Sequence, residues 1–356
     1  MKRSKKLFIW EIMVSVLLMT QIGCHMNAQN KAEESLKIGI TLYNQYDTFV
    51  SAMMNDLQEY AIAQEKEWET DIIIDIYNAS GSQIMQNEQV EKMIEDGCDV
   101  VCVNLVDRTE PTVIIDMAEK NNIPVIFFNR ELVEEDLERG NNLYYVGAKT
   151  LESGIMQGEI AAAIFKNNVK ADKNADGIFQ YVVLEGEAGH QDAIVRTEYS
   201  VSTILDNGVR VEKLGYAIAN WNRAQSQTKM AHMLLEYGEN IELVLTNNDD
   251  MALGVVDALK TAEIPTEEWP VVLGIDGTEI GIKAVKNREM AGTVYNDANG
   301  QAERMLDLAY ELCIGGELER LGLEDGKYIR LPYAKVEPDD VDKFLHSQSS
   351  DSKPHT

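Results

Sequence analysis

The alternation of short apolar runs with longer segments of helical periodicity is the strongest constraint on the fold of this chain. Four apolar runs of strand length come first, at residues 37–43, 71–77, 99–103 and 124–128. Between them, apolar residues recur every three or four positions, which is the period of an amphipathic helix. Nearly continuous apolar strands that alternate with helices are typical of parallel sheets covered on both faces. The first part of the chain therefore predicts a βαβ lobe.

A second series of the same kind follows a run at residues 143–146. Its strands are expected at residues 179–184, 209–217, 242–246, 270–275 and 292–295. Two such series in 356 residues predict an α/β fold with two doubly wound parallel-sheet lobes. A further strand at residues 328–331 is expected to return to the first lobe. The chain would then cross between the lobes several times, through a multi-strand hinge near Gly147, Asn296 and Pro332.

These crossings define the expected domain organisation. We assign residues 37–147 and 297–332 to the N-terminal lobe, and residues 148–296 and 333–345 to the C-terminal lobe. Residues 346–356 are polar and are expected to form a disordered tail.

The N-terminus has the features of an export signal. Basic residues at Lys2, Arg3, Lys5 and Lys6 precede an apolar stretch at residues 7–20 that is short for a bilayer span, which predicts a signal peptide over residues 1–23. The segment that ends at Cys24 is similar to a bacterial lipobox, so we expect Cys24 to be lipidated and residues 24–36 to form a tether. Ordinary signal peptidase cleavage is the alternative, because Gln21 stands where leucine is usual. Either way the protein is expected to act outside the cytoplasm, anchored at the outer face of the membrane or in the periplasm.

Charge and cysteine content exclude several classes of partner. The chain has 60 acidic and 32 basic residues, a net charge of −28, which repels nucleic acid and anionic lipid surfaces. Membrane contact is therefore expected through the lipid anchor only. Four cysteines are too few for a disulfide scaffold, and Cys98, Cys102 and Cys313 are expected to be buried free thiols.

Polar and aromatic residues gather after the predicted strands, at the carboxyl ends where open α/β sheets bind ligands. There are ten of them, from both lobes: Asp47, Phe49, Asn129, His190, Asp192, Arg196, Trp221, Asn248, Asp276 and Asn296. Singly, some have a simpler structural role, since Asp47 and Asn129 could cap helices and Asp276 could start one. Their recurrence at one end of successive strands favours a shared binding site.

The chemistry of this set suits a sugar ring. Carboxylate, amide and guanidinium groups can satisfy hydroxyls that both donate and accept hydrogen bonds, while aromatic rings stack on C–H faces. Phe49 from one lobe and Trp221 from the other could sandwich a pyranose. The residues therefore predict a monosaccharide as the ligand.

Seven segments carry a resemblance to a known family. They read KIGITLYNQYDTF, VIFFNRE, YYVG, GEAGHQDAIVRT, NNDDMALG, GIDGTE and GTVYNDAN. With them the chain resembles the bacterial periplasmic galactose/glucose-binding proteins, a branch of the type I periplasmic binding proteins, over residues 37–345. The resemblance implies a monomeric receptor that binds D-glucose or D-galactose at the ten positions above and delivers it to an ABC permease, and in some members to a chemoreceptor. Another monosaccharide remains the alternative, because Arg130 stands where a lysine is familiar.

The resemblance, together with the chemistry of the side chains, also implies individual roles. Asp47 and Asp276 are expected to accept hydrogen bonds from ring hydroxyls. Arg196 is expected to donate to the ring and anomeric oxygens, with Asp192 beside it, and His190 to reach the exocyclic hydroxyl.

A calcium loop is predicted in the second lobe. Asp172, Asn174, Asp176, Gly177, Ile178 and Gln180 have the spacing of positions 1, 3, 5, 6, 7 and 9 of an EF-hand loop, with Ile178 offering its carbonyl. Position 12 is Val183, so a carboxylate must come from elsewhere, and the family resemblance nominates Glu242. These hard oxygen ligands suit structural Ca²⁺. An Asp/Asn-rich turn without metal is the alternative.

Two other function classes can be compared with a receptor. A glycoside hydrolase could use a pair from Asp47, Asp192 and Asp276, but Asp192 lies four residues before Arg196 and is expected to be charge-paired with it. No nucleophile elbow, P-loop or HExxH motif occurs. A sugar-responsive repressor needs a basic DNA-binding headpiece, and here an acidic chain with a signal peptide stands in its place. The sequence therefore favours a receptor that is not an enzyme.

Overall fold

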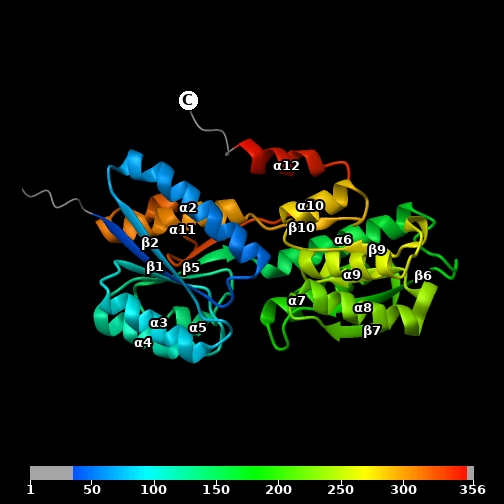
Figure 1. The fold of residues 1–356 in the computed structure, drawn as a ribbon, viewed down its shortest axis with the longest axis horizontal. Coiled ribbons are helices and arrows are strands. Elements are labelled where there is room, and N and C mark those ends of the chain that lie inside the picture. The colour runs from blue at the N-terminus through cyan, green and yellow to red at the C-terminus, as the bar shows by residue number, and fades with distance from the viewer. Residues whose placement is uncertain (1–34, 351–356) are drawn as a thin grey trace, which may run out of the picture.

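The computed structural model describes residues 35–350, with the side chains of residues 346–350 left out, and forms two lobes side by side along the long axis (Figure 1). The predicted signal peptide and Cys24 lie outside the described residues.

The N-terminal lobe is built on a six-stranded parallel sheet with the order β11-β5-β4-β3-β1-β2. Its strands are β1 (Leu36–Leu42), β2 (Ile72–Asn78), β3 (Val100–Val103), β4 (Val125–Phe128), β5 (Leu143–Ala148) and β11 (Tyr328–Leu331). Helices cover both faces (Figure 1), namely α2 (Thr48–Trp68) and α11 (Ala298–Ile314) on one, and α3 (Gln83–Glu95) and α4 (Thr112–Asn121) on the other. A one-turn helix, α5 (Glu134–Leu137), and the 3-10 helix η3 (Leu318–Leu321) lie in connections.

Strand β3 explains why the sequence reads as a continuous apolar run. Val100 and Cys102 face the core under α2 and α11, whereas Val101 and Val103 face the core over α3 and α4. Because successive side chains of a strand point to opposite faces, a sheet covered on both sides needs apolar residues at every position.

The C-terminal lobe has a four-stranded parallel sheet with the order β7-β6-β8-β9. These strands are β6 (Ile178–Glu185), β7 (Arg210–Ile218), β8 (Leu243–Thr246) and β9 (Val271–Leu273). One face carries α6 (Thr150–Asn167) and α7 (Gln191–Asp206), and the other carries α8 (Arg223–Tyr237), α9 (Asp249–Thr261) and α10 (Glu279–Lys286). The 3-10 helices η1 (Gly238–Asn240) and η2 (Thr266–Glu268) lie in connections.

The predicted α/β fold with two parallel-sheet lobes is confirmed. Strand β11 pairs with β5, so the chain passes between the sheets after β5, after β10 (Thr293–Tyr295) and after β11. Strand β12 (Ala334–Val336) was not predicted, because its middle residue is Lys335 and the segment forms no apolar run. It pairs with β10 in antiparallel orientation, and β10 in turn makes isolated parallel bridges beside β9.

Two sequence predictions are wrong in the described chain. Residues 346–350, predicted to be disordered, belong to helix α12 (Val341–Ser350), which starts with Val341 in the core of the C-terminal lobe and with Phe344 and Leu345 packed against it. Cys98 and Cys102 are buried as expected, but Cys313 is exposed at the end of α11. Within residues 35–350, no helix combines the length and the apolar character that a bilayer crossing requires.

Candidate functional site

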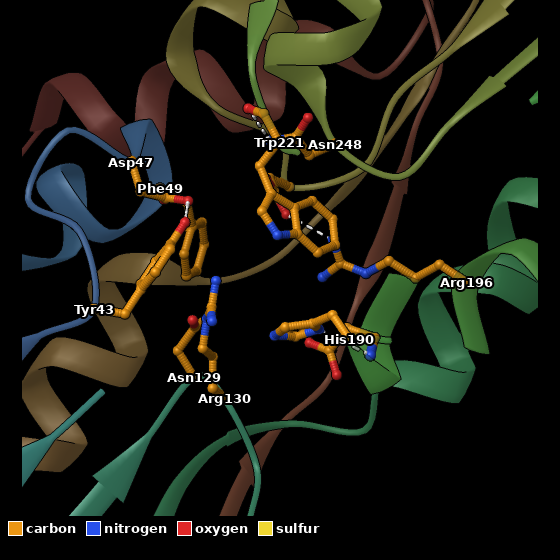
Figure 2. Close-up of a pocket in the computed structure, with 11 residues that line it drawn as sticks. Tyr43, Asp47, Phe49, Asn129, Arg130, His190, Arg196, Trp221 and Asn248 are labelled. Carbon is orange, nitrogen blue, oxygen red and sulfur yellow. Dashed lines mark hydrogen bonds and ion pairs between the residues drawn. The ribbon is translucent and has the colours of Figure 1, made fainter. Parts of the chain in front are cut away.

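A cavity lies between the two lobes, at the carboxyl ends of the strands (Figure 2). It contains about 360 Å³ of space free of protein atoms, part of which is open to solvent. Nine of the ten predicted residues line it: Asp47, Phe49, Asn129, His190, Asp192, Arg196, Trp221, Asn248 and Asp276. The structure adds Tyr43 and Arg130.

The strand order explains why residues far apart in sequence meet here. In each lobe the first strand lies between the second and the third, as the orders β3-β1-β2 and β7-β6-β8 show. At such a switch point the loops that follow neighbouring strands run in opposite directions and leave a crevice. Asp47 follows β1 and His190 follows β6, so each lobe contributes its own crevice to the cavity.

Three of the lining residues also cap helices. Asp47 Oδ1 accepts a hydrogen bond from Val50 N (2.9 Å) at the start of α2. Asn248 caps α9, and His190 Nδ1 accepts from Asp192 N (3.2 Å) at the start of α7. The capping role and the lining role therefore coexist for Asp47, because one oxygen caps and the side chain still lines the cavity. Asn129 and Asp276 do not serve as caps in the described helices, and Thr278 caps α10.

A buried ion pair forms one wall of the cavity. Arg196 Nη1 lies 3.4 Å from Asp276 Oδ1 and donates to Asn247 O (2.7 Å), while Nη2 lies 3.5 Å from the hydroxyl of Tyr333. The side chains of Arg196 and Asp276 are 6% and 9% exposed. Burial raises the pKa of Asp276 above its usual range, and the guanidinium of Arg196 opposes that rise.

Aromatic rings from both lobes face the cavity (Figure 2). Phe49 comes from α2, whereas Trp221 comes from the loop after β7 and meets the imidazole of His190 edge to face, with 5.3 Å between ring centroids. Gly186 makes room for the indole, because a Cβ there would lie 2.3 Å from Trp221 Cη2. A flat apolar surface from each lobe is thus available to one ligand.

The backbone is strained at three of the lining residues. Asn129, Trp221 and Asp276 have φ values of 60°, 58° and 112°, in the region that residues other than glycine rarely occupy. Such conformations cost about 1–3 kcal/mol each and cluster at ligand-binding sites. Three of the eleven described non-glycine residues with positive φ thus line this one cavity.

Two buried N–H groups on lining residues lack a protein acceptor. Among the described residues, neither Arg196 Nε nor Trp221 Nε1 has a hydrogen-bond partner. An unmade hydrogen bond at a buried donor is costly, so the site suits a ligand that supplies acceptor oxygens.

Two predictions about the site need correction. Asn296 does not line this cavity. Its backbone N–H binds the carbonyl of Asp276 (2.9 Å), its Oδ1 accepts from Gln301 Nε2 (2.7 Å), and it lines a neighbouring cavity together with Phe49 and Asp276. Asp192 does not form the expected ion pair with Arg196. Its Oδ1 accepts from Thr150 Oγ1 (2.9 Å), and the ion-pair partner of Arg196 is Asp276.

Sequence reasoning missed two kinds of residue. Tyr43 ends an apolar strand and reads as core, although its hydroxyl donates to Asp47 Oδ2 (2.6 Å) beside the cavity. Asn104 is fully buried after β3, and its Nδ2 donates to Asn129 Oδ1 (3.1 Å), which orients that amide. A polar residue directly after a buried strand was the available signal for Asn104.

The predicted calcium loop has a partly EF-like geometry. Gly177 has φ 73°, and backbone N–H groups of the loop bind Asp172 and Asp176. Glu242 is buried, with Oε1 accepting from Lys173 N (2.5 Å) and Oε2 from Gln180 N (3.2 Å). The amide Oε1 of Gln180 is buried and has no partner in the described chain.

The loop can supply enough oxygen ligands for a hard cation only if amide and backbone carbonyl oxygens contribute as well as carboxylates. Within residues 35–350, no three acidic, histidine or cysteine side chains form a metal-binding group. The remaining oxygens come from Asn174, Gln180 and the carbonyl of Ile178. The unpartnered oxygen of Gln180 is the observation that favours a cation over a turn stabilised only by its own hydrogen bonds.

Comparisons with known proteins extend over most of the chain. The profile of the family described as "Periplasmic binding protein domain" matches residues 38–317. The chain is 32% identical over 315 residues to the D-galactose/methyl-galactoside binding periplasmic protein MglB of Haemophilus influenzae, covering 87% of this chain and 92% of that protein. It is 28% identical over 302 residues to the xylitol-binding protein of Mycolicibacterium smegmatis, covering 85% and 78%. A solved ABC transporter solute binding protein from Bacillus halodurans with bound myo-inositol superposes with a TM-score of 0.74 at 27% identity, covering 89% of this chain and 99% of that one.

Proposed function

Because this chain belongs to the periplasmic binding protein family, as its motifs predicted, we propose that it captures one uncharged monosaccharide between its lobes and delivers it to an ABC permease. The site supports a polyhydroxylated ligand rather than a charged one. Its two arginines already have carboxylate partners, Glu187 for Arg130 and Asp276 for Arg196. The relatives named above bind galactosides, xylitol and myo-inositol, all of which are neutral polyols.

The unpartnered N–H groups of Arg196 and Trp221 carry the proposal. Ring and hydroxyl oxygens of a sugar would accept from them. The carboxylates of Asp47 and Asp276 would accept from hydroxyls in return. Phe49 and Trp221 would cover the two apolar faces of the ring.

We propose D-glucose or D-galactose as the sugar, on the strength of the sequence motifs and the galactoside-binding relative. Mass spectrometry of the ligand that co-purifies with the protein, followed by titration calorimetry of the refolded, ligand-free protein, tests this. D-galactose or D-glucose should bind at least about tenfold more tightly than xylitol or myo-inositol, since an ill-matched hydroxyl leaves buried polar groups unpaired. Tighter binding of either polyol would reassign the ligand, and no binding of any of the four would overturn the proposal.

Closure of the lobes would couple binding to transport. A sugar that contacts both lobes binds the closed state better than the open one, so it shifts the population toward closure. The three passages of the chain between the sheets are the natural hinge for this motion. The closed form would be the one that the permease recognises, and a chemoreceptor could recognise the same form. Membership of the periplasmic binding protein family supports a site of action outside the cytoplasm, whereas lipidation of Cys24 stays a prediction.

We propose binding without turnover. Each carboxylate that a hydrolase would need already has a partner in the described chain: Tyr43 for Asp47, Thr150 for Asp192 and Arg196 for Asp276. A catalytic carboxyl group must be free to exchange a proton with the glycosidic oxygen or with a water molecule, whereas these three side chains are already engaged by protein partners.

The imidazole of His190 should add no pH dependence to binding across the range in which an ordinary histidine titrates. Burial lowers the pKa of His190 to about 4, so the imidazole is neutral from pH 8 down to about pH 5. With Nδ1 accepting from Asp192 N, the proton lies on Nε2, which can donate to a sugar oxygen. We expect the affinity measured by calorimetry to have the same pH dependence in the native protein and in His190→Gln over that window. Only the native protein should show a further loss as the pH approaches 4, where the charged imidazole forms. A loss of affinity centred near pH 6.5 in the native protein, absent from His190→Gln, would contradict this assignment.

We further propose that Ca²⁺ binds the loop of residues 172–180 together with Glu242. Asp172, Asn174, Asp176 and Gln180 would contribute side-chain oxygens, and Ile178 its carbonyl. The cation would cross-link the start of β6 to the residue before β8, so its role would be structural.

A further inference from the structure

Arg130 lines the cavity (Figure 2) and makes contacts with both lobes. It follows β4 in the N-terminal lobe and is 4% exposed. Its Nη1 donates to Val106 O (3.1 Å), and its Cζ lies 3.4 Å from the centroid of the Tyr43 ring. One contact of its guanidinium leaves the lobe, since Nη2 lies 2.9 Å from Glu187 Oε2.

Glu187 belongs to the other lobe. It lies in the loop between β6 and α7, three residues before His190. Its side chain is 45% exposed, whereas that of Arg130 is 5% exposed. The ion pair therefore spans the gap that must open for a ligand to enter or leave. Because the Glu187 carboxylate is exposed to solvent, dissolved salt can screen the attraction between the two charges.

The ion pair is connected to a sugar-binding carboxylate. Arg130 stacks on the ring of Tyr43, and the hydroxyl of Tyr43 donates to Asp47 Oδ2 (2.6 Å). A planar guanidinium can stack and donate from two nitrogens at once, which a lysine ammonium cannot do. Arg130 can therefore pair with Glu187 of the other lobe and at the same time hold the ring of Tyr43, whose hydroxyl positions Asp47.

We propose that Arg130 and Glu187 form a latch that stabilises the closed state and slows release of the ligand. The inference rests on the proposed function, because it assumes that the lobes close around a sugar. A second contact between the lobes, from Thr48 Oγ1 to Asp250 Oδ2 (2.6 Å), lies on α2 and α9. Its hydroxyl donor is neutral. The other ion pair between the lobes, Lys149–Glu324 (3.3 Å), lies beside the chain crossing after β5, where the hinge keeps the lobes together. The latch should therefore account for most of the salt dependence of release.

The test compares the native protein with Glu187→Gln, Arg130→Lys and the double variant. Asp257→Asn is the matched control, because Asp257 pairs with Arg223 inside the C-terminal lobe, away from the cavity. Dissociation of D-galactose and D-glucose is followed by stopped-flow tryptophan fluorescence at low and high NaCl. Small-angle scattering of the ligand-free proteins reports how far the lobes are open.

We expect Glu187→Gln to release the sugar roughly two- to fivefold faster at low salt, the range for a partly exposed ion pair, and to lose the salt dependence of the native rate. Because lysine keeps the charge but loses the stacked geometry, Glu187→Gln should accelerate release less in the Arg130→Lys background than in the native protein, and Asp257→Asn should match the native protein. The ligand-free Glu187→Gln should be more extended than the native protein. An unchanged release rate and unchanged scattering in Glu187→Gln would overturn the latch and leave the sugar site intact.

The proposed function can fail separately from the latch. If the native protein binds neither sugar, the ligand assignment is wrong, and the scattering of the ligand-free proteins then decides the latch. In that case a more extended Glu187→Gln supports it and identical profiles refute it.

Discussion

Replacing Asp276 by alanine is expected to weaken monosaccharide binding by about 30-fold or more. The substitution removes an acceptor for sugar hydroxyls and leaves the buried guanidinium of Arg196 without its ion-pair partner. A buried hydrogen-bonded charge whose partner is truncated costs ~2 to 5 kcal/mol. Titration calorimetry with D-galactose and D-glucose measures the effect directly.

Two further variants separate this loss from misfolding. Asp257→Ala removes a partly exposed carboxylate from the same lobe and should keep the native affinity. Asp276→Asn keeps the volume and one acceptor oxygen, so its affinity should fall between those of the native protein and Asp276→Ala. Native affinity in a folded Asp276→Ala would refute the site.

Replacing Glu242 by alanine is expected to destabilise the protein by about 3 kcal/mol and to abolish its response to a chelator. The carboxylate is 1% exposed and accepts from the backbone N–H groups of Lys173 and Gln180, which would both lose their partner. Each such buried donor costs about 1–3 kcal/mol. Chemical denaturation measures the loss of stability.

The chelator tests calcium itself. A cation that binds only the folded protein raises its stability in proportion to the logarithm of its concentration, so EGTA should lower the melting temperature of the native protein by several degrees. Glu239→Ala, an exposed acidic residue close by, should respond to EGTA as the native protein does. A native melting temperature that ignores EGTA would mean that the loop is a turn stabilised by its own hydrogen bonds.

Most strands could be placed from the sequence because their environment is simple. A strand such as β3 is buried on both faces, so every position is apolar and the run stands out. Strand β12 has three residues and depends on β10 for its pairing, so no local pattern could reveal it. The end of helix α12 was wrongly predicted to be disordered for a related reason. Its apolar residues stabilise a helix only because they pack against α10 and the core of the C-terminal lobe.

The site was predictable as a set and not in its details. Side chains that follow parallel strands must meet at one edge of the sheet, and nine of the ten predicted residues do line the cavity. The exception is Asn296, whose side chain is held by a hydrogen bond with Gln301. The residue types alone do not reveal this pairing. For Asp47 the two interpretations of the sequence are both correct, because the same carboxylate caps helix α2 and lines the cavity.

The order of strands and helices, and the chemistry that follows each strand, were thus determined by the sequence alone, because periodicity and turn residues act over a few neighbours. The tertiary structure decided which atoms meet. Arg130 and Glu187 are 57 residues apart and belong to different lobes, so their contact depends on how two separately packed sheets are oriented by the hinge. The orientation of Asp276 toward Arg196, rather than of Asp192, was decided in the same way, by packing between segments that no local pattern connects.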